Sequence, residues 1–489
     1  MKSIWVRDYI DFTLPSVGKN IKTPLLIIGG GLAGLMCAYE LMQKNIDFIL
    51  VDAKKLGRGV SANTTAQVSL AHDKLYHDIQ KCHGETKARA YLREQIKGLA
   101  QIKKIIKEEK IACDYHEEST ILGAIEPQKC AQIDEMYALI NKETTVKMVK
   151  HSKEVLPFNS AIEFEKQIII NPVKYLNGII RILQNKKIKL YENSKVTSIN
   201  KQAQHYEVII NEKHVINTNK IIMACHYPFL LQNFYFTKIH QSCSYATTFK
   251  TKLKLKANYV SLDAPYYYLR TYDKNTLIIG GADHFTGANV DVQSCYDKLK
   301  NKIDELSQNA TILSSWFTED CMPLNYLPYV CQFSKQHPNI ILVTGFQKWG
   351  FTNAHAAALQ VPSLLTKNKY QPNSLALLKN SKNYLRMLGR SIEGLFISKI
   401  FLKESLISEI PIGSGKALRW RSKNILVYRT NEKEYIYLKN KCTHMGCSLI
   451  WNDVDKVWLS KCHGTIYDKD GTVIYGPGIK NLEKVKINF

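Results

Sequence analysis

The feature that most constrains the fold is a glycine-rich turn in the segment LLIIGGGLAGLMCAYELMQKNIDFILVDAKK, at residues 25–55. An apolar run precedes Gly29, Gly31 and Gly34, a stretch with helical spacing follows them, and a second apolar run ends at Asp52. In such a strand–turn–helix–strand unit the glycines permit a tight turn, approach of a pyrophosphate and close helix packing. The helix N-terminus meets the phosphate charge, and the acid receives ribose hydroxyls. The segment therefore predicts a dinucleotide site beside a buried parallel sheet.

Length and hydropathy narrow the class of protein. A chain of 489 residues is too long for one compact core and predicts two or three domains. The N-terminus has no cationic head before an apolar region, and no apolar run reaches the roughly 20 residues of a spanning helix, so we expect a cytoplasmic protein. The nearest approach, SIEGLFISKIFLK at 391–403, is short and broken by charges. We expect it to pack as a helix or strand rather than to contact a membrane.

The formal net charge of +24 comes mostly from lysine and would suit a polyanionic partner. However, basic runs such as KKIIKEEK at 103–110 are short, mixed with acids and spread over the chain, without an RNA-binding signature. A solvated lysine-rich surface is therefore favoured over nucleic-acid binding.

The loop GRGVSANTTAQVS at 57–69 decides between FAD and NAD, which both use the glycine turn. It offers hydroxyls and backbone amides in quantity. At this point the sequence resembles the D-amino-acid-oxidase-like FAD-dependent oxidoreductases, in which such a loop runs beside the pyrophosphate and flavin. The resemblance implies that FAD is the cofactor and that Ser61, Thr64 and Thr65 contact it.

Later stretches extend this resemblance to about residue 370. Val196 stands where the family's backbone contacts adenine, and GFQKWGFTNAHAAALQVPSLL at 345–365 resembles its closing loop and helix. There Gly345, Gly350 and Thr352 would aim a helix N-terminus at the flavin. That positive end would stabilise the negative charge of the reduced ring.

Tyrosine-rich strands between about 230 and 330 resemble the family's antiparallel sheet, which roofs the flavin ring. Tyr245, Tyr268, Arg270 and His284 are the polar residues there that could face a substrate. In DCMPLNYLPYVC, Asp320 stands where amino-acid oxidases of this superfamily commonly carry a carboxylate-binding arginine. Asp320 would suit a cationic amine, whereas an α-carboxylate would need Arg270 or another cation. Arg270, His284 and Asp320 are thus the substrate-site candidates.

The mechanism implied by the resemblance is hydride transfer from the carbon that bears an amine to the flavin, followed by hydrolysis of the imine. A neutral amine would need no acid–base residue, so none is assigned as catalytic. The predicted protein is an amine or amino-acid oxidase or dehydrogenase that passes electrons to oxygen or a soluble carrier. A tRNA-acting flavoprotein and a non-catalytic electron-transfer or sensor flavoprotein stay open as alternatives.

Three of the twelve cysteines crowd into the last fifty residues, whereas the other nine are scattered singly. They lie in the motifs CTHMGC and SKCHG, and short predicted strands surround them. The pattern resembles the Rieske [2Fe–2S] domain, in which each of two loops gives one Cys and one His. Cys442, His444 and His463 match three of its four ligands.

The resemblance puts Ser460 at the fourth ligand position, where the Rieske domain has a thiolate. It puts Cys447 and Cys462 where that domain has a disulfide. Iron with sulfur ligands prefers soft thiolate, and an alkoxide is hard and poorly ionised near neutral pH. Three outcomes stay open: a serine-ligated cluster, Cys462 in the ligand role at the expense of the disulfide, or a fold without a cluster. The [2Fe–2S] cluster is therefore left uncertain.

The expected fold class joins three parts. An α/β, Rossmann-like FAD-binding domain of the glutathione-reductase-2 type is interrupted by an antiparallel β-sheet substrate domain, and a small all-β Rieske-like domain follows. The expected boundaries are 1–229 and 332–370 for the FAD domain, 230–331 for the substrate domain, 371–404 for a connecting segment and 405–489 for the Rieske-like domain.

Overall fold

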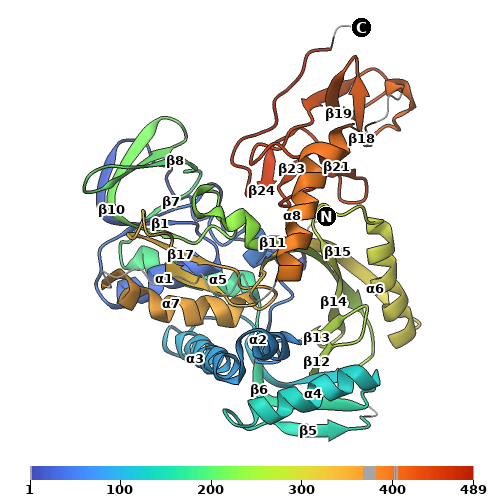
Figure 1. The fold of residues 1–489 in the computed structure, drawn as a ribbon. Helices are drawn as coiled ribbons and strands as arrows, with labels where there is room; N and C mark the ends of the chain where they lie inside the picture. Colours follow the sequence, from blue (N-terminus) through green and yellow to red (C-terminus); the bar gives the residue numbers. More distant parts are fainter. Residues whose placement is uncertain (1–2, 153–154, 367–380, 401, 403–405, 488–489) are drawn as a thin grey trace.

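The computed structural model describes residues 3–152, 155–366, 381–400, 402 and 406–487. Two large mixed sheets form the body of the protein, and a smaller β-module follows them in the chain (Figure 1). This arrangement confirms the predicted fold class.

The first sheet carries the glycine turn. Its strands are β1 (Ile21–Ile28), β2 (Ile49–Val51), β7 (Lys189–Tyr191), β8 (Val196–Lys201), β9 (Tyr206–Ile210), β10 (His214–Met223), β16 (Tyr329–Gln332) and β17 (Ile340–Thr344). Their order is β16-β17-β10-β1-β2-β7, with β8 and β9 branching from β10. The strands from β17 to β7 are parallel, and their apolar side chains are buried because helices and loops cover the sheet.

Within the described ranges, two helices contact the strands of this sheet, α1 (Leu32–Gln43) and α7 (Gly350–Thr366). Three more pack on them in turn: α5 (Pro172–Asn185) on α1, α3 (Glu85–Glu108) on α7, and α2 (Leu75–His83) on α3. The Asn171 side chain accepts hydrogen bonds from the N–H groups of Val173 and Lys174, which caps α5. Gly98 lets α3 approach α7, because a Cβ there would lie 2.3 Å from the carbonyl oxygen of Thr352. Helix α7 also packs on α1.

The second sheet has nine strands among the described residues. Its strands are β3 (Gln67–Val68), β4 (His116–Ala124), β5 (Lys147–Lys150), β6 (Ser160–Ile169), β11 (Ile239–Lys250), β12 (Asn258–Ser261), β13 (Tyr267–Asp273), β14 (Thr276–Phe285) and β15 (Thr311–Pro323). Their order is β15-β11-β14-β13-β12-β4-β6-β3, and β5 pairs with β6. Helices α4 (Pro127–Ile140) and α6 (Val292–Leu306) lie against it.

The sheet membership differs from the expected domain boundaries. The expected FAD domain included everything up to residue 229, yet β3 to β6 belong to the second sheet. They join it because β4 pairs in parallel with β12, with Leu122 opposite Val260. Strand β16, expected in the substrate domain, pairs with β17 in the first sheet.

A helical segment leads to the C-terminal module (residues 406–487). It comprises α8 (Ser381–Ile392), a π-helical turn (Glu393–Ile397) and α9 (Ser398–Ile400). The module has two small sheets: β18 (Gly415–Trp420), β19 (Lys423–Arg429) and β20 (Tyr435–Lys439), then β21 (Leu449–Asn452), β22 (Val457–Ser460), β23 (Ile466–Asp468) and β24 (Val473–Tyr475). The rest of the expected connecting segment, except Leu402, lies outside the described residues.

The module is fixed to the body by side-chain hydrogen bonds. Lys54 Nζ donates to the Ile474 carbonyl over 2.8 Å, and Tyr296 OH donates to Asp455 Oδ1 over 3.0 Å. Both bonds join residues far apart in the sequence. In the described part of the chain, no helix combines the length and the apolar character needed to cross a bilayer.

Candidate functional site

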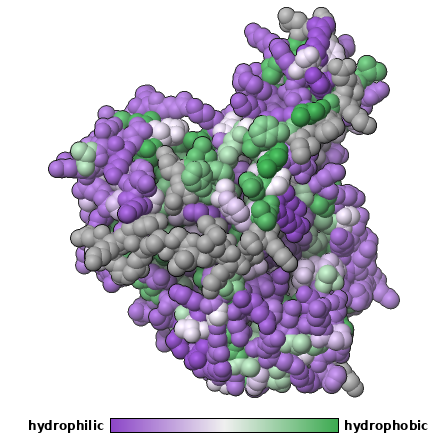
Figure 2. Space-filling view, viewed as in Figure 1, coloured by the Kyte–Doolittle hydropathy of each residue, from purple (hydrophilic) through white to green (hydrophobic). Residues whose placement is uncertain are grey.

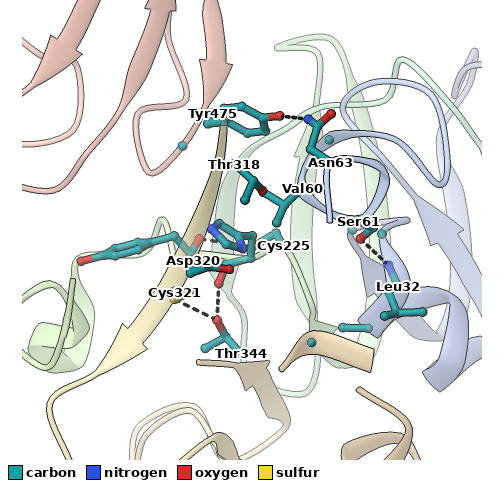
Figure 3. A pocket seen from close by; sticks show the side chains of 18 of the residues that line it. Leu32, Val60, Ser61, Asn63, Cys225, Thr318, Asp320, Cys321, Thr344 and Tyr475 are labelled. Atoms are coloured by element: carbon teal, nitrogen blue, oxygen red, sulfur yellow. Dashed lines mark hydrogen bonds between the residues drawn. The ribbon is translucent and has the colours of Figure 1, made fainter. Parts of the chain in front are cut away.

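A cavity of about 750 Å³ lies between the two sheets and the C-terminal module. Residues of three regions line it: the glycine turn with its neighbouring loops, strands β11, β13, β14 and β15, and the segment from Thr472 to Ile479 of the module. Figure 3 shows side chains from these regions converging on it. Its volume lies within the range of small-molecule and cofactor sites.

The glycine turn is shaped by close backbone approach. Gly29 has a φ of +107°, and a Cβ there would lie 2.5 Å from the Ala224 carbonyl oxygen. A Cβ on Gly34 would lie 1.8 Å from the Gly29 carbonyl oxygen, so the turn and α1 could not pack as they do. Gly31 lines the cavity, and its Cβ would lie 3.1 Å from Ser61 Oγ. The turn therefore keeps side chains away from the N-terminus of α1, which faces the cavity.

Asp52 holds the turn from the end of β2. Its two carboxylate oxygens accept hydrogen bonds from the N–H groups of Gly30 and Lys54, each over 2.7 Å. Burial raises the pKa of Asp52, and these two hydrogen bonds act against that shift. Because Asp52 also lines the cavity, it is placed to meet hydroxyls of a ligand.

Most of the predicted FAD contacts share this cavity. Gly29, Gly31, Asp52, Ser61, Thr64, Thr65, Val196, Gly345 and Gly350 line it, whereas Gly34 and Thr352 are not part of the lining. Thr352 is buried, and its Oγ1 lies 3.1 Å from His72 Nε2. Helix α7 begins at Gly350, so its N-terminus faces the same space as that of α1.

At the end of the cavity under the second sheet, acidic groups surround one lysine. Lys348 Nζ lies 2.9 Å from Asp283 Oδ1 and donates to Tyr268 OH over 3.0 Å. Burial alone would lower the pKa of Lys348, but Tyr268, Asp283 and Asp73 raise it well above its usual range. Lys348 is therefore a charged lysine already paired with a carboxylate.

Asp320 lines the same end of the cavity, and Ser244 Oγ donates a hydrogen bond to its Oδ2 over 3.1 Å. Burial raises the pKa of Asp320 to about 7, although the Lys348 charge and the Ser244 hydrogen bond lower it. A carboxyl group with such a pKa in a cavity is a candidate for binding or proton transfer.

Two residues that were predicted to contact the substrate lie outside the cavity lining. The guanidinium of Arg270 is buried and donates to the carbonyl oxygens of Thr65 and Ala66, over 2.9 and 2.6 Å. His284 Nε2 lies 2.8 Å from Tyr245 OH. Neither Arg270 nor His284 belongs to the cavity lining, whereas Tyr245 and Tyr268 do. Arg270 thus holds the loop after η2 (Gly59–Ala62) rather than meeting a substrate.

Sequence reasoning missed two contributors to the cavity. Lys348 stands between Gly345 and Gly350 in GFQKWG, where a charged residue in a glycine-flanked loop was the available signal. Tyr475 of the C-terminal module closes the cavity, and its hydroxyl accepts a hydrogen bond from Asn63 Nδ2 over 2.7 Å. Burial raises the pKa of Tyr475. The module is therefore part of the wall of this site.

A second site lies within the module. The rings of His444 and His463 are 5.0 Å apart between centroids. Both ring nitrogens of His444, Nε2 of His463 and Oγ of Ser460 are buried and have no hydrogen-bond partner among the described residues. Burial lowers the pKa of His444 to about 4 and of His463 to about 3, so both rings can offer a lone pair near pH 7.

Cys442 completes the set, with its Sγ 3.4 Å from Tyr467 OH. Unpartnered polar atoms at three of the four predicted ligand positions fit a metal group held between the two loops. The fit is incomplete in its chemistry, because Ser460 offers a hydroxyl where a [2Fe–2S] cluster takes a thiolate.

The predicted disulfide between Cys447 and Cys462 is present, with an S–S distance of 2.02 Å. Its sulfurs and a ring nitrogen of His463 lie within 4.8 Å of one another. Because disulfide sulfurs are not thiolates, Cys462 is not available as a replacement ligand while this bond exists.

The histidine side of the module faces the body. Tyr227 and His444 have ring centroids 6.4 Å apart, and Phe236 and His463 have ring centroids 5.6 Å apart. Gln241 Nε2 donates to the His463 carbonyl over 2.7 Å and to the Gly476 carbonyl over 3.0 Å. The candidate metal site and the cavity are thus joined through one side chain of β11.

Comparison with known proteins identifies both parts. Residues 25–361 match the family described as FAD dependent oxidoreductase. The chain belongs to that family. Residues 402–486 match the Rieske [2Fe-2S] domain. The predicted resemblance is therefore confirmed, and with it FAD as the cofactor of this FAD dependent oxidoreductase.

Relatives extend the match over the whole chain. The Bacillus subtilis protein YhfW, whose name describes a Rieske 2Fe-2S iron-sulfur protein, is 26% identical over 490 residues, covering 97% of this chain and 96% of its own. Gamma-glutamylputrescine oxidoreductase of Escherichia coli is 23% identical over 381 residues, covering 72% of this chain and 85% of its own. The structure of glycine oxidase from Geobacillus kaustophilus is similar in fold, with a TM-score of 0.60 at 13% identity, covering 72% and 97% of the two chains.

The glycine turn generates a first prediction. Gly31→Val should remove FAD from this oxidoreductase, because the added carbons would point toward Ser61 and into the space of the pyrophosphate. The measurement is the visible flavin absorbance of the purified protein, and the identity of the cofactor after denaturation. Gly18→Val is the matched control, since a Cβ at Gly18 meets no atom within 4 Å. A yellow Gly31→Val protein with full FAD content would contradict this reading.

Ser460 generates a second prediction. After anaerobic reconstitution with iron and sulfide, the Ser460→Cys variant should give a strong Rieske-type EPR signal on reduction, and the native protein a faint signal or none. The reason is that the variant restores the soft ligand without touching the Cys447–Cys462 disulfide. Ser460→Ala should behave like the native protein. A full, stable signal from the native chain would show instead that the Ser460 oxygen ligates iron.

Proposed function

We propose that this FAD dependent oxidoreductase oxidises a small amine, which binds as a cation beside Asp320 and delivers a hydride to FAD. The observation that carries the proposal is the Asp320 carboxyl group in the cavity wall, at the position where a carboxylate-binding arginine was expected in amino-acid oxidases. That the protein is a FAD dependent oxidoreductase rests on the family. The substrate class rests on Asp320.

The charges near Asp320 favour an ammonium group over a carboxylate. Asp73, Asp283 and Asp320 all interact electrostatically with Lys348. Lys348 is paired with Asp283, and Lys74 also acts on Asp73, so Asp320 is left without an ion-pair partner within 4 Å among the described residues. A substrate cation would offset the excess negative charge, whereas a substrate carboxylate would add to it.

The arginine in the cavity lining supports the same choice. Among the described lining residues the one arginine is Arg58, on the loop after β2. Its guanidinium lies 3.9 Å from the ring centroid of Tyr9, beside the glycine turn. It is thus placed toward the phosphate end of the site. The Escherichia coli relative is named for γ-glutamylputrescine, a compound that carries a primary amine.

The chain's own residues would orient the substrate and move its proton. FAD, when bound, supplies the hydride acceptor. Asp320 would bind the ammonium group and then accept one of its protons, because only the neutral amine readily loses a hydride from the adjacent carbon. A pKa near 7 suits both steps. Ser244 fixes the carboxyl group, and Tyr268 and Lys348 form the neighbouring wall.

The substrate class generates a third prediction. Under anaerobic conditions primary amines and diamines should reduce the flavin, while hydroxy acids and aldehydes should not. Asp320→Asn should slow reduction by the best amine by about tenfold or more, since it removes the charge that binds the cation. Asp304→Asn, in an exposed i,i+4 pair with Lys300 on α6, is the control. Reduction by hydroxy acids alone would refute the amine assignment.

The pKa of Asp320 generates a fourth prediction. The pKa is raised to about 7 by burial, so the carboxylate form that binds and deprotonates an amine is lost as the pH falls below about 7. The rate of anaerobic flavin reduction should therefore rise with pH through about 7 in the native protein. In Asp320→Asn this step should be absent, leaving only the titration of the substrate amine. An unchanged profile in the variant would exclude Asp320 as the group concerned.

Oxygen or a soluble carrier as the electron acceptor stays a prediction. The alternatives of a tRNA-acting flavoprotein and of a non-catalytic carrier or sensor gain no support from the described residues. Neither alternative accounts for the charged residues Asp320 and Lys348 in the cavity wall.

A further inference from the structure

A stripe of large apolar side chains is exposed along the helical segment that precedes the C-terminal module. Leu385, Leu388, Ile392, Phe396 and Ile400 follow one another at spacings of three or four residues and are between 43% and 66% exposed. Such spacing puts them on one side of a helix. Figure 2 shows apolar side chains gathered in this part of the surface, over α8 in the view of Figure 1.

The opposite side of the same segment is packed. Met387 is buried, Gly394 accepts a hydrogen bond from the Ser448 N–H at its carbonyl, and Cys462 Sγ lies 3.6 Å from the Ser391 carbonyl oxygen. A Cβ on Gly394 would lie 2.5 Å from Cys462 Sγ. The expectation that residues 391–403 form a packed helix or strand, and not a membrane contact, therefore holds for one face of the described part only. The other face is held outward by these contacts.

The exposed stripe continues onto the body. Helix α8 contacts η3 (Gln232–Thr237), where Phe234 is 65% exposed, and Leu231 just before it is 47% exposed. Contiguous apolar surface of this kind on a soluble domain marks an interaction site. Single exposed apolar residues would need no explanation, but a stripe with a second element beside it does.

Basic residues accompany the stripe. In sequence, residues 381–400 carry four Lys or Arg residues against one acid, Glu393. Of these, Lys399 donates from Nζ to the Gly446 carbonyl oxygen. Arg386 is exposed, and Arg390 lies over the Phe285 ring, 3.9 Å from its centroid. An amphipathic helix with Leu and Phe on one face and Lys and Arg flanking it has the character of a segment that lies in a membrane interface.

The net charge of the chain helps to decide whether a second copy or a membrane covers the stripe. A second copy would bring the same basic flank against itself, because a two-fold interface places each patch on its own equivalent. With a formal net charge of +24 on each chain, that contact would be repulsive. An anionic bilayer is complementary to both features. Its negative headgroups would attract the basic residues, and its apolar interior would bury the stripe.

We propose that the α8–α9 segment docks this protein on an anionic membrane surface, with Leu385, Leu388, Ile392, Phe396 and Ile400 inserted at the headgroup boundary. The protein would lie on the bilayer without spanning it. This proposal is independent of the substrate assignment, since none of these residues lines the cavity. It puts the loops of the candidate metal site next to the membrane-facing helix.

The test is flotation of the full-length protein with vesicles. Vesicles of equal parts phosphatidylcholine and phosphatidylserine should carry the protein upward, and pure phosphatidylcholine vesicles should carry much less. The double variant Leu388→Glu/Phe396→Glu should lower the affinity by about tenfold or more, because two inserted apolar groups are replaced by charges that the lipid repels. Arg386→Glu should lower the preference for anionic lipid. Raised salt should weaken binding without abolishing it.

Leu313→Glu is the matched control, because Leu313 is 51% exposed on β15 and lies outside the stripe. Flavin absorbance checks that every variant keeps the native site. Failure of the native protein to float with anionic vesicles would overturn the proposal, as would equal flotation of the double variant. A native dimer in solution that Phe396→Glu converts to a monomer would assign the stripe to a second copy instead.

Discussion

Two helix N-termini, those of α1 and α7, point at one cavity, and much of the architecture serves to hold them there. Both helices follow strands of the parallel sheet, β1 and β17, which flank β10. They therefore emerge at the same edge and pack on each other. The positive ends of the two helix dipoles create a field that suits an anionic cofactor. The close approaches at Gly34 and Gly98 show how little room this packing leaves for any side chain.

The electrostatics of the cavity change from one end to the other. Near the glycine turn the field comes from helix N-termini and Arg58, which suits phosphates. Under the second sheet, half-buried carboxylates share Lys348, and desolvation raises the pKa of Asp73 to about 6 and of Asp320 to about 7. Buried acids with raised pKa values next to a ligand cavity are the groups that proteins use to bind cations and move protons. The cavity thus has a positive end that suits the cofactor phosphates and an acidic end that suits a cationic substrate.

The C-terminal module is built into the oxidoreductase rather than appended to it. Tyr475 closes the cavity, and Gln241 links β11 to the loop of His463. The two histidines of the candidate metal site face aromatic side chains of the body. Ser460 is buried with an unpartnered hydroxyl, so the site keeps its shape around a changed ligand.

The sequence by itself determined the features whose residues lie in one short segment. The turn from Gly29 to Asp52, the loop of Ser61 to Thr65 and the pairing of Cys447 with Cys462 could be predicted, because spacing within a motif fixes their geometry or their family. For residues 391–403 the sequence left helix and strand open, and the described part is helical.

Only the tertiary structure decided which face of each element is buried and which segment it packs against. The sequence pointed to Arg270 as the substrate-facing cation and not to Lys348. Strand register turns Arg270 toward the carbonyls of Thr65 and Ala66, while the loop before α7 puts Lys348 in the cavity. Strands β3 to β6 joined the second sheet through pairing with β12, and Tyr475 reached the cavity from more than four hundred residues beyond Asn63. Periodicity says that one face of a strand or helix is buried, but not against which partner. That choice depends on contacts between distant segments, which form only when the chain is folded.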